Sequence, residues 1–326
     1  NLNTVMSTYS ATPQNIWPLF DQNTKDVALW TAGQSNQMGY GGTANGINTG
    51  VGTPLQHPIY PNGVDGRRSM YPSCAAALGV YGYKLGVHNF AVGSSGIVEN
   101  WVGNIQDWVN NGLIKIGGYR AFGGRVYKAF LSTGINGMPN CTTPPTNGGV
   151  DGTITWTDVG PDTGFRGTVP FTSQYFDPNG YISLLTASMA ASDSPRKFVY
   201  VAFGETDANM NVSRSDYSAA LVAFTNAVLA AGAHRVGIGH TFGQAAWITK
   251  YTTDLIPGMK DSIASFSNDK RVFASLNKYA AFGSLPTSPA SGVGFIADGL
   301  HGNDSAYDGA GAALALNMLG QLKAMA

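Results

Sequence analysis

A serine stands among small and amide side chains where the first apolar, β-branched run of the chain ends. The run Val27–Ala32 leads directly into Gly33–Asn36, which reads Gly-Gln-Ser-Asn and carries Ser35. A turn of small residues after a buried strand can expose a serine hydroxyl at the head of the next helix, where backbone N–H groups face an incoming anion. On Ser35 alone, turn and cap residues are the more ordinary interpretation, and the segment lacks the G-x-S-x-G pattern of a nucleophile elbow.

An aspartate and a histidine stand three residues apart near the end of the chain, as Asp298 and His301 within Ile296–Asn303. A serine nucleophile needs an imidazole to take its proton and a carboxylate to orient that imidazole. One loop ahead of the last helical pattern could supply both groups. An Asx turn beside a solvent-facing histidine explains this pair equally well when it is taken alone.

Short apolar runs alternate with helical patterns along the chain, which predicts an α/β fold with a parallel, doubly wound sheet. The expected strands are Val27–Ala32, His88–Val92, Phe198–Phe203, Arg235–Phe242 and Val272–Ser275. The expected helices are Pro72–Leu85, Tyr181–Ala191, Asp216–Ala231 (with Ser215 as its cap), Leu255–Phe266 and Asp308–Leu319. Ligands in this architecture bind beyond the carboxyl ends of the strands, so the chemistry is expected there.

The alternation breaks between residues 123 and 176, where Pro, Gly and Thr are frequent. Two alternating stretches in this segment, Arg125–Leu131 and Thr153–Val159, predict strands. An irregular connection of this length is uncommon inside a compact domain. We therefore expect one α/β domain formed by residues 1–122 and 177–326, with a β-rich module inserted at 123–176.

Composition limits the classes of function. Of the 326 residues 43% are hydrophobic, enough for a sizeable core, and only 12% are charged, with 19 basic residues against 19 acidic ones. Without a basic run, nucleic acid is not an expected partner. Without an apolar stretch of about 18 residues, no segment is expected to span a membrane. The weak charge and the abundance of Asn, Gly and Thr predict a location outside the cytosol.

The start of the chain and its cysteines add two expectations. Asn1–Ser10 lacks an initiator methionine and the pattern of a signal peptide, which predicts a piece of a longer protein. Cys74 and Cys141 are the only cysteines. One disulfide between them is an alternative, but two inert thiols are favoured. Neither a dense Asp or His cluster nor an HExxH pattern occurs, so no metal is indicated.

Together, the motifs resemble the SGNH (GDSL-like) hydrolase superfamily, in its branch of sialate O-acetylesterases and carbohydrate esterases. The resemblance spans nearly the whole chain in four ordered blocks: Gly33–Asn36, Asn89–Ile97 followed by Trp101, Gly204–Ala208, and Asp298–His301. It implies a flavodoxin-like three-layer α/β/α fold around a parallel five-stranded sheet, the SGNH hydrolase fold. It also implies a Ser-His-Asp acyl-enzyme mechanism with Ser35 as nucleophile, His301 as base and Asp298 as orienting carboxylate, without a cofactor.

The oxyanion hole of the family would take the N–H groups of Ser35 and of Ser94, or else Gly93, with Thr206 as a third donor. The chain departs from the family pattern in two of these blocks. Ser94 stands where the family usually has glycine. Phe203 stands where the branch has a glutamine, and Thr206 where the superfamily has an asparagine. Losing one donor typically costs about 3 kcal/mol of transition-state stabilisation, which predicts a slower enzyme.

The substrate is expected to contact Gln34, Asn36, Glu205 and Trp101, the last by stacking on a sugar ring. Glu205 and Asp207 could instead form a glycosidase pair. On an extended segment they would point the same way, too close together to flank a sugar, so we favour a structural role in which one carboxylate ties the loops together. Other aromatic candidates for stacking, each equally suited to a core, are Tyr40, Trp108, Tyr119 and Trp247.

By resemblance, the chain is expected to remove O-acetyl groups from a polysaccharide such as a bacterial surface glycan. Gly152–Gly160, within the inserted module, resembles small β-modules of bacteriophage tail fibres and tailspikes. That implies a carbohydrate-binding or spacer unit, an extracellular or virion location, and a homotrimer if the chain is part of a tailspike. The alternatives are a secreted bacterial xylan or sialic acid acetylesterase, a non-catalytic glycan-binding adhesin domain of a phage tail protein, and a glycosidase that uses Glu205 or Asp207.

Overall fold

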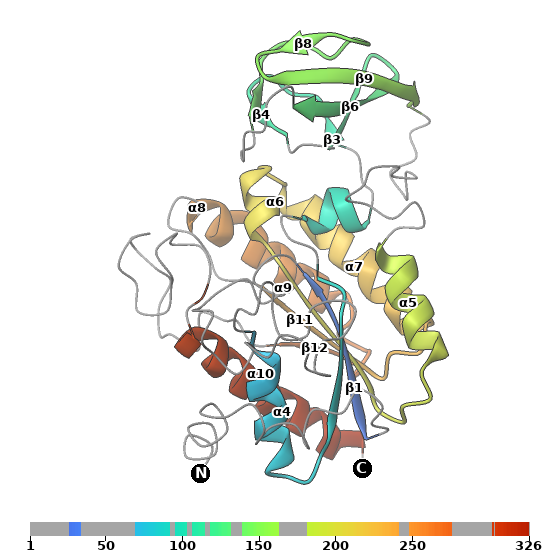
Figure 1. Cartoon of the computed structure of the whole chain (residues 1–326), viewed down its shortest axis with the longest axis vertical. Coiled ribbons are helices and arrows are strands. Elements are labelled where there is room, and N and C mark those ends of the chain that lie inside the picture. Colours follow the sequence, from blue (N-terminus) through green and yellow to red (C-terminus); the bar gives the residue numbers. More distant parts are fainter. Residues whose placement is uncertain are drawn as a thin grey trace, which may run out of the picture.

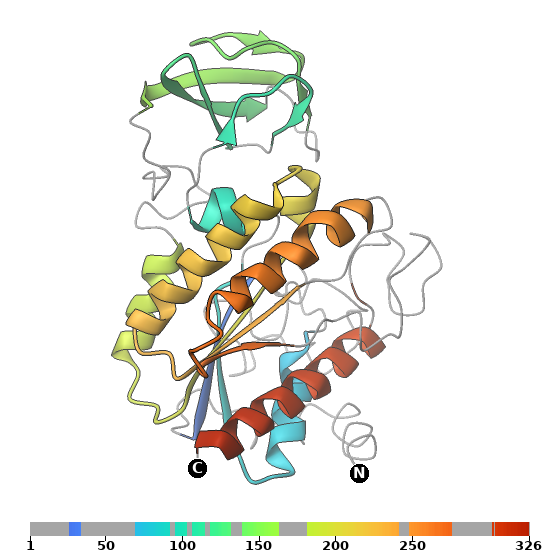
Figure 2. The same ribbon diagram turned by 180° about the vertical axis from the view of Figure 1, so that it is seen from behind.

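An α/β part and a smaller β-rich part make up the molecule (Figures 1 and 2). None of the helices in the described residues is both long and apolar enough to cross a lipid bilayer. The computed structural model of the chain describes residues 26–33, 69–91, 95–102, 106–114, 118–131, 139–162, 181–240, 248–275, 302 and 304–325.

Five parallel strands form the central sheet, in the spatial order β12-β11-β10-β1-β2. Counted along the chain, these strands lie in the order 2-1-3-4-5, which is the flavodoxin-like order of doubly wound sheets. Every residue of β1 is buried, as expected of a strand that is covered on both faces. The predicted parallel sheet is therefore confirmed. Its strands are β1 (Val27–Gly33), β2 (Leu85–Asn89), β10 (Lys197–Phe203), β11 (Arg235–His240) and β12 (Val272–Ala274).

The predicted helices are present, most of them with shifted ends. The helix at Tyr181–Ala191 has the predicted bounds, whereas the last helix is longer than its apolar pattern at both ends. Two short helices and two π-helical turns follow no pattern that we could read. The helices are α4 (Tyr71–Gly79), α5 (Tyr181–Ala191), α6 (Glu205–Asn209), α7 (Arg214–Ala230), α8 (Ile248–Lys250), α9 (Ile256–Ala264) and α10 (Asp304–Met325), and the turns are η3 (Ile97–Trp101) and η5 (Tyr251–Leu255).

Helices cover both faces of the sheet. Successive side chains of a strand point to opposite faces, so contacts of two neighbouring residues of β1 reveal both layers. The indole Nε1 of Trp30 donates to Ser188 Oγ of α5 at 3.0 Å. The next residue, Thr31, accepts at 3.0 Å from the hydroxyl of Tyr71 in α4, on the other face. Helix α10 packs on α4, and α7 packs between α5 and α9 (Figure 2). The result is a layered arrangement of helices, sheet and helices.

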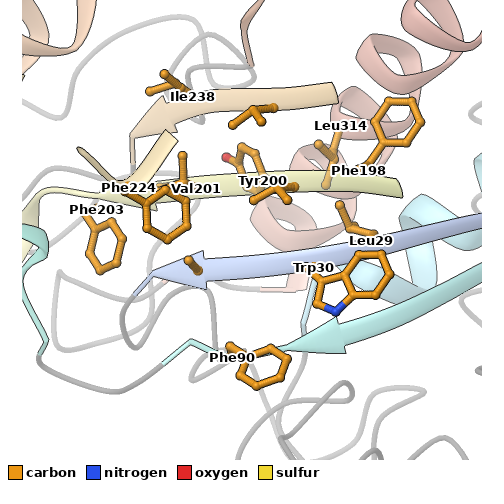
Figure 3. Close-up of a cluster of buried hydrophobic side chains, with 14 of the residues drawn as sticks. Leu29, Trp30, Phe90, Phe198, Tyr200, Val201, Phe203, Phe224, Ile238 and Leu314 are labelled. Atoms are coloured by element: carbon orange, nitrogen blue, oxygen red, sulfur yellow. The ribbon is translucent and has the colours of Figure 1, made fainter. Parts of the chain in front are cut away.

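Aromatic and branched side chains fill the space between the sheet and the helices. The indole of Trp30 stacks on the ring of His88 with 4.6 Å between centroids. Burial of this kind supplies most of the free energy that favours folding. Figure 3 shows part of this core, in which strand residues such as Leu29, Phe198, Tyr200, Val201 and Ile238 meet Phe224 of α7 and Leu314 of α10.

The β-rich part contains a second five-stranded sheet, in the order β3-β5-β6-β9-β8. The predicted strand Arg125–Leu131 is confirmed with the same bounds, and the second predicted strand is shifted by a residue or two. A two-stranded sheet of β4 and β7 lies beside it. The strands are β3 (Gln106–Asp107), β4 (Gly112–Leu113), β5 (Tyr119–Phe122), β6 (Arg125–Leu131), β7 (Asn140–Cys141), β8 (Val150–Asp151) and β9 (Ile154–Pro161).

The predicted boundary of the inserted module at residue 123 is too late. Gly123 and Gly124 have φ values of 57° and 76° and form the turn of the β5–β6 hairpin. A two-residue hairpin turn of type I′ has positive φ at both central positions, which explains the glycine pair. The strands of the second sheet therefore begin at Gln106, well before the glycines that we took as the start of an irregular segment.

Both cysteines are free and buried, which confirms the favoured alternative. Cys74 lies in α4 and Cys141 in β7. Burial raises the pKa of the Cys74 thiol well above its usual range and that of Cys141 to about 11. Because the thiolate is the reactive form, neither side chain is activated for chemistry.

Candidate functional site

Three of the sequence blocks reach the same edge of the parallel sheet. Gly33 is the last residue of β1, Asn89 is the last of β2, and Gly204 follows the end of β10. These strands are neighbours, and the carboxyl ends of parallel strands are where ligands bind in this architecture. The predicted site residues that lie outside the described residues are Gln34, Ser35, Asn36, Gly93, Ser94, Asp298 and His301.

A buried chain of hydrogen bonds ties β1, β2 and α4 together at this edge. The hydroxyl of Tyr71 donates to Thr31 Oγ1 at 3.0 Å, and Thr31 Oγ1 donates to Asn89 Oδ1 at 2.8 Å. Asn89 Oδ1 also accepts from the N–H of Ala91 at 3.1 Å, and the N–H of Phe90 donates to Thr31 O at 2.9 Å. Burial keeps the pKa of Tyr71 far above its usual range, so the hydroxyl stays a neutral donor. The point at which the second block leaves the sheet is thereby fixed.

Ser95 joins the second block to the end of β1. Its Oγ donates to the carbonyl oxygen of Gly33 at 3.3 Å and accepts from Trp101 Nε1 at 3.0 Å. Gly33 stands two residues before Ser35, so this contact lies at the beginning of the first block. Ser95 was not among the predicted site residues. Its block also contains the polar residues Asn89 and Ser94, and nothing in the local sequence distinguishes Ser95 from them.

Trp101 is a core residue, which corrects the prediction that it stacks on a sugar. Its side chain is 2% exposed. Its ring meets the rings of Phe203 and Phe224 edge-on, with 5.4 Å and 5.9 Å between centroids. A ring enclosed in this way presents no face to a ligand. Its role is to pack η3 against the core and to hold Ser95 through the indole N–H.

Asp207 joins the third block to the second. The carboxylate is fully buried and accepts from the N–H of Ile97 at 3.2 Å and from the N–H of Val98 at 3.3 Å. These are the first N–H groups of η3, which have no partner within the turn itself. A Cβ atom at Gly96 would lie 2.8 Å from Asp207 Oδ1, so a larger residue there would displace the carboxylate. The expectation that one carboxylate ties the loops together is confirmed for Asp207.

Glu205 and Asp207 lie on the short helix α6 and not on an extended segment, which corrects our premise about their directions. Residues two apart on a helix point to nearly opposite sides. Both side chains are buried, so the described geometry offers no pair of carboxylates that flank an open cleft. Glu205 likewise lacks the exposed surface that the predicted substrate contact requires. Among the residues that the structure describes, no three His, Cys, Asp or Glu side chains lie close enough to hold a metal ion.

Two tyrosines lie against the turn from β10 into α6. The hydroxyl of Tyr217 donates to the carbonyl oxygen of Phe203 at 3.0 Å. Gly204 has a φ of 153°, and a Cβ atom there would lie 2.8 Å from the hydroxyl of Tyr251. Thr206, the predicted third oxyanion donor, is the second residue of α6 and is 4% exposed.

The η3 turn also connects the edge of the parallel sheet to the β-rich part. Glu99 in η3 accepts from the N–H of Tyr119 at 2.7 Å and forms an ion pair with Arg120 at 3.1 Å. Both charged side chains are almost fully buried. A buried pair with good partners fixes geometry more than it adds stability. Asp207 and β5 thus hold the second block from two directions.

The burial of Asp207 makes the stability of the fold depend on pH. Burial, with a smaller effect from the charge of Glu99, raises the pKa of Asp207 to about 7, against the opposing hydrogen bonds from Ile97 and Val98. In the unfolded chain the same carboxyl titrates near its usual pKa of about 4. Between these two values only the folded state holds the proton, so the free energy of unfolding falls as the pH rises.

We expect Asp207→Asn, which cannot ionise, to lose this dependence. Between pH about 5 and about 8, the free energy of unfolding of the wild type should fall by on the order of 3 kcal/mol relative to the variant. Urea unfolding of both chains at a series of pH values measures this difference, and histidine titrations cancel in the comparison. Parallel pH profiles of the two chains would contradict the shift.

Comparison with known proteins adds no assignment to this geometry. No protein-family model matches the chain, and no curated protein matches it either. The described ends of three blocks meet at one edge of a parallel sheet and are tied to each other by Ser95, Asp207 and the Thr31–Asn89 pair.

Proposed function

We propose that the chain is a serine carbohydrate O-acetylesterase with an SGNH hydrolase fold. The observation that carries the proposal is the meeting of the ends of β1, β2 and β10 at one sheet edge, with the blocks joined by Ser95 and Asp207. A nucleophile, its base and its oxyanion donors must come together from distant parts of the chain. The strand order supports this arrangement, because it brings the ends of β1, β2 and β10 together as neighbours.

The proposed reaction passes through an acetyl-enzyme. Ser35 Oγ attacks the acetyl carbonyl carbon while His301 takes the hydroxyl proton and Asp298 orients the imidazole. The tetrahedral oxyanion accepts hydrogen bonds from the N–H groups of Ser35 and of Ser94, or Gly93. The intermediate collapses, and the sugar oxygen leaves with the proton from His301. Water, activated by the same imidazole, then attacks the acetyl-enzyme and releases acetate.

The described residues act in this proposal by positioning. Oxyanion donors are effective only when they are preorganised where the charge develops. The segment that follows Gly93 and Ser94 is held by Ser95 on Gly33 and by Asp207 on Ile97. Phe203 is buried in the core, which fits a hole that lacks the glutamine of the branch. Thr206 would then be the third donor from the start of α6.

The substrate in this proposal is an O-acetylated polysaccharide, and the chain is part of a phage tailspike or a related extracellular protein. The β-rich module supports a tail-protein setting through its resemblance to modules of that class. If the chain assembles as tailspikes do, the full protein forms a homotrimer. The secreted bacterial esterase shares the same chemistry and differs only in setting.

Covalent labelling tests the proposal directly. A fluorophosphonate probe is expected to add once per chain to the peptide that contains Ser35, with parallel loss of acetate release from acetylated xylan and from acetylated bacterial polysaccharides. Mass spectrometry of the digested adduct identifies the labelled residue. The adhesin alternative expects polysaccharide binding without labelling or acetate release. Labelling at a different serine would overturn the assignment of Ser35.

A further inference from the structure

Lys128 is a nearly buried cation to which the described part of the chain offers no anion. It lies in β6 of the second sheet, and the residue is 6% exposed. Its Nζ lies 5.8 Å from the centroid of the Tyr119 ring and 5.1 Å from that of Phe130. Within the described part of the chain, the ammonium group makes no hydrogen bond and no ion pair. Withdrawing an ammonium group from water without a partner is unfavourable, and ring faces offset only part of that cost.

Lys128 shares one face of the second sheet with Phe130 and with residues of β8 and β9. Across the ladder, Lys128 pairs with Thr157 and Phe130 pairs with Thr155, so all four side chains share one face of the sheet. Val150 extends this face on β8, opposite Thr155. Phe130 is 43% exposed and Val150 is 64% exposed. We call these five residues the Lys128 face.

The carboxylates of Asp158 and Glu99 do not pair with the Lys128 ammonium group. Arg125 pairs with Asp158, which lies opposite Tyr127 in the ladder and so on the other face of the sheet. Glu99 is committed to Arg120 and to the backbone of Tyr119. Burial lowers the pKa of Lys128, which is the direction expected of a cation that lacks a counter-charge.

We propose that the Lys128 face binds an acidic saccharide, with a sugar carboxylate on the Lys128 ammonium and the C–H face of the pyranose on Phe130. Thr157 lies beside Lys128 and Thr155 beside Phe130 on the neighbouring strand β9, where their hydroxyls bond the sugar hydroxyls. A neutral sugar leaves the ammonium unpaired. A phosphate chain lacks the apolar face that Phe130 accommodates, and nucleic acid needs several cations where the described part of this face has one. The inference goes beyond the proposed esterase, because binding here needs no turnover.

Matched ligands and matched variants test the proposal. The probes are oligomers of galacturonic acid, glucuronic acid and sialic acid, each compared with its neutral methyl ester, and the protein is the Ser35→Ala chain so that no ester is cleaved. Calorimetry is expected to show that at least one acid binds about tenfold or more tightly than its ester. Lys128→Met should abolish that preference, and Phe130→Thr should weaken both forms by about threefold or more.

Two control variants distinguish binding at the Lys128 face from non-specific electrostatic or hydrophobic binding elsewhere on the protein. Lys260→Met removes an exposed lysine of α9, and Phe122→Thr removes an aromatic side chain from the opposite face of the same sheet. Both are expected to bind the acid like the parent chain. If Lys128→Met fails to fold, the affinities of the Ser35→Ala chain are measured at increasing NaCl concentration instead. The affinity for the acid should fall with added salt, and the affinity for the neutral ester should not. Equal affinity for acid and ester, or no binding of any probe up to about 10 mM, overturns the proposal.

The two proposals fail in different ways. If the wild type releases no acetate and the Ser35→Ala chain still prefers the acid, the esterase is wrong and the Lys128 face stands. If acetate is released and no acid is preferred, the Lys128 face is wrong and the esterase stands. Neither result depends on the other, since one is a rate and the other an affinity.

Discussion

Replacing Ser35 with alanine is expected to lower the rate of acetate release by about 10³-fold or more, leaving the rate supported by the oxyanion donors alone. The reason is that no other group can form the acetyl-enzyme once the nucleophile is gone. His301→Ala should cost about as much, and the double variant should be no slower than either single variant, because the two residues act as one unit. Initial rates with para-nitrophenyl acetate at pH about 7.5 measure all three.

The control for this experiment is a serine outside the site. Ser265 is exposed beyond the end of α9, where its Oγ donates to the carbonyl oxygen of Asp261 at 3.0 Å. Ser265→Ala is expected to hydrolyse the ester at the wild-type rate. A wild type that is no faster than Ser35→Ala would remove the catalytic assignment and leave the adhesin. If the wild type hydrolyses a glycoside and only variants of Glu205 or Asp207 lose that activity, the glycosidase is favoured.

The sheet could be predicted because buried parallel strands have a simple signature. An apolar run that is covered on both faces needs no periodicity to be recognised, and β1 and β10 lie where such runs predict them. β2 shows the limit of that signature. We predicted His88–Val92, whereas the strand is Leu85–Asn89 and the chain leaves the sheet at Phe90. Phe90 and Ala91 are apolar and buried like the residues of the strand itself. Their composition therefore could not show that they lie outside it.

Helix ends were harder to predict, because neighbouring polar residues compete for the cap. We expected Ser215, but Ser213 caps α7 by accepting from the N–H of Asp216 at 3.1 Å. The hydroxyl of Ser213 also donates to the Asp216 carboxylate, so the two residues are joined twice in the first turn of the helix. Both serines satisfy the composition of a cap, and only the backbone decides which of them is used.

The contacts that join the blocks could not be read from local patterns. The order of the blocks predicted that they would converge, but Asp207 reaches Ile97 across a separation of 110 residues. Nothing in the spacing of Gly96, Ile97 and Val98 indicates a π-helical turn or marks its first N–H groups as partners for a carboxylate. Asp207 was a candidate because it belongs to the third block and could have formed a glycosidase pair with Glu205, although we favoured a structural role. Its actual role follows from tertiary geometry.

Replacing Gly311 with alanine is expected to destabilise the fold by about 3 kcal/mol or more. Here α10 crosses α4 so closely that a Cβ atom would lie 2.1 Å from the carbonyl oxygen of Met70 and 2.9 Å from the N–H nitrogen of Cys74. These two backbone atoms bond to each other at 3.0 Å in the first turn of α4, so neither can yield as a flexible side chain would. The helices must separate instead, which also breaks the hydrogen bond from Ser73 to Asp308.

The same helix offers matched controls, because a Cβ atom at Gly309 or at Gly320 meets nothing within 4 Å. Alanine at either position should leave stability unchanged or raise it by about 0.5 to 1 kcal/mol, since alanine loses less backbone entropy than glycine in a helix. Urea unfolding followed by circular dichroism compares the three variants. Gly311→Ala should also lose esterase activity, because α4 carries Tyr71 and α10 begins three residues after His301. A Gly311→Ala chain as stable as the Gly320→Ala chain would mean that the two helices do not cross as closely as described.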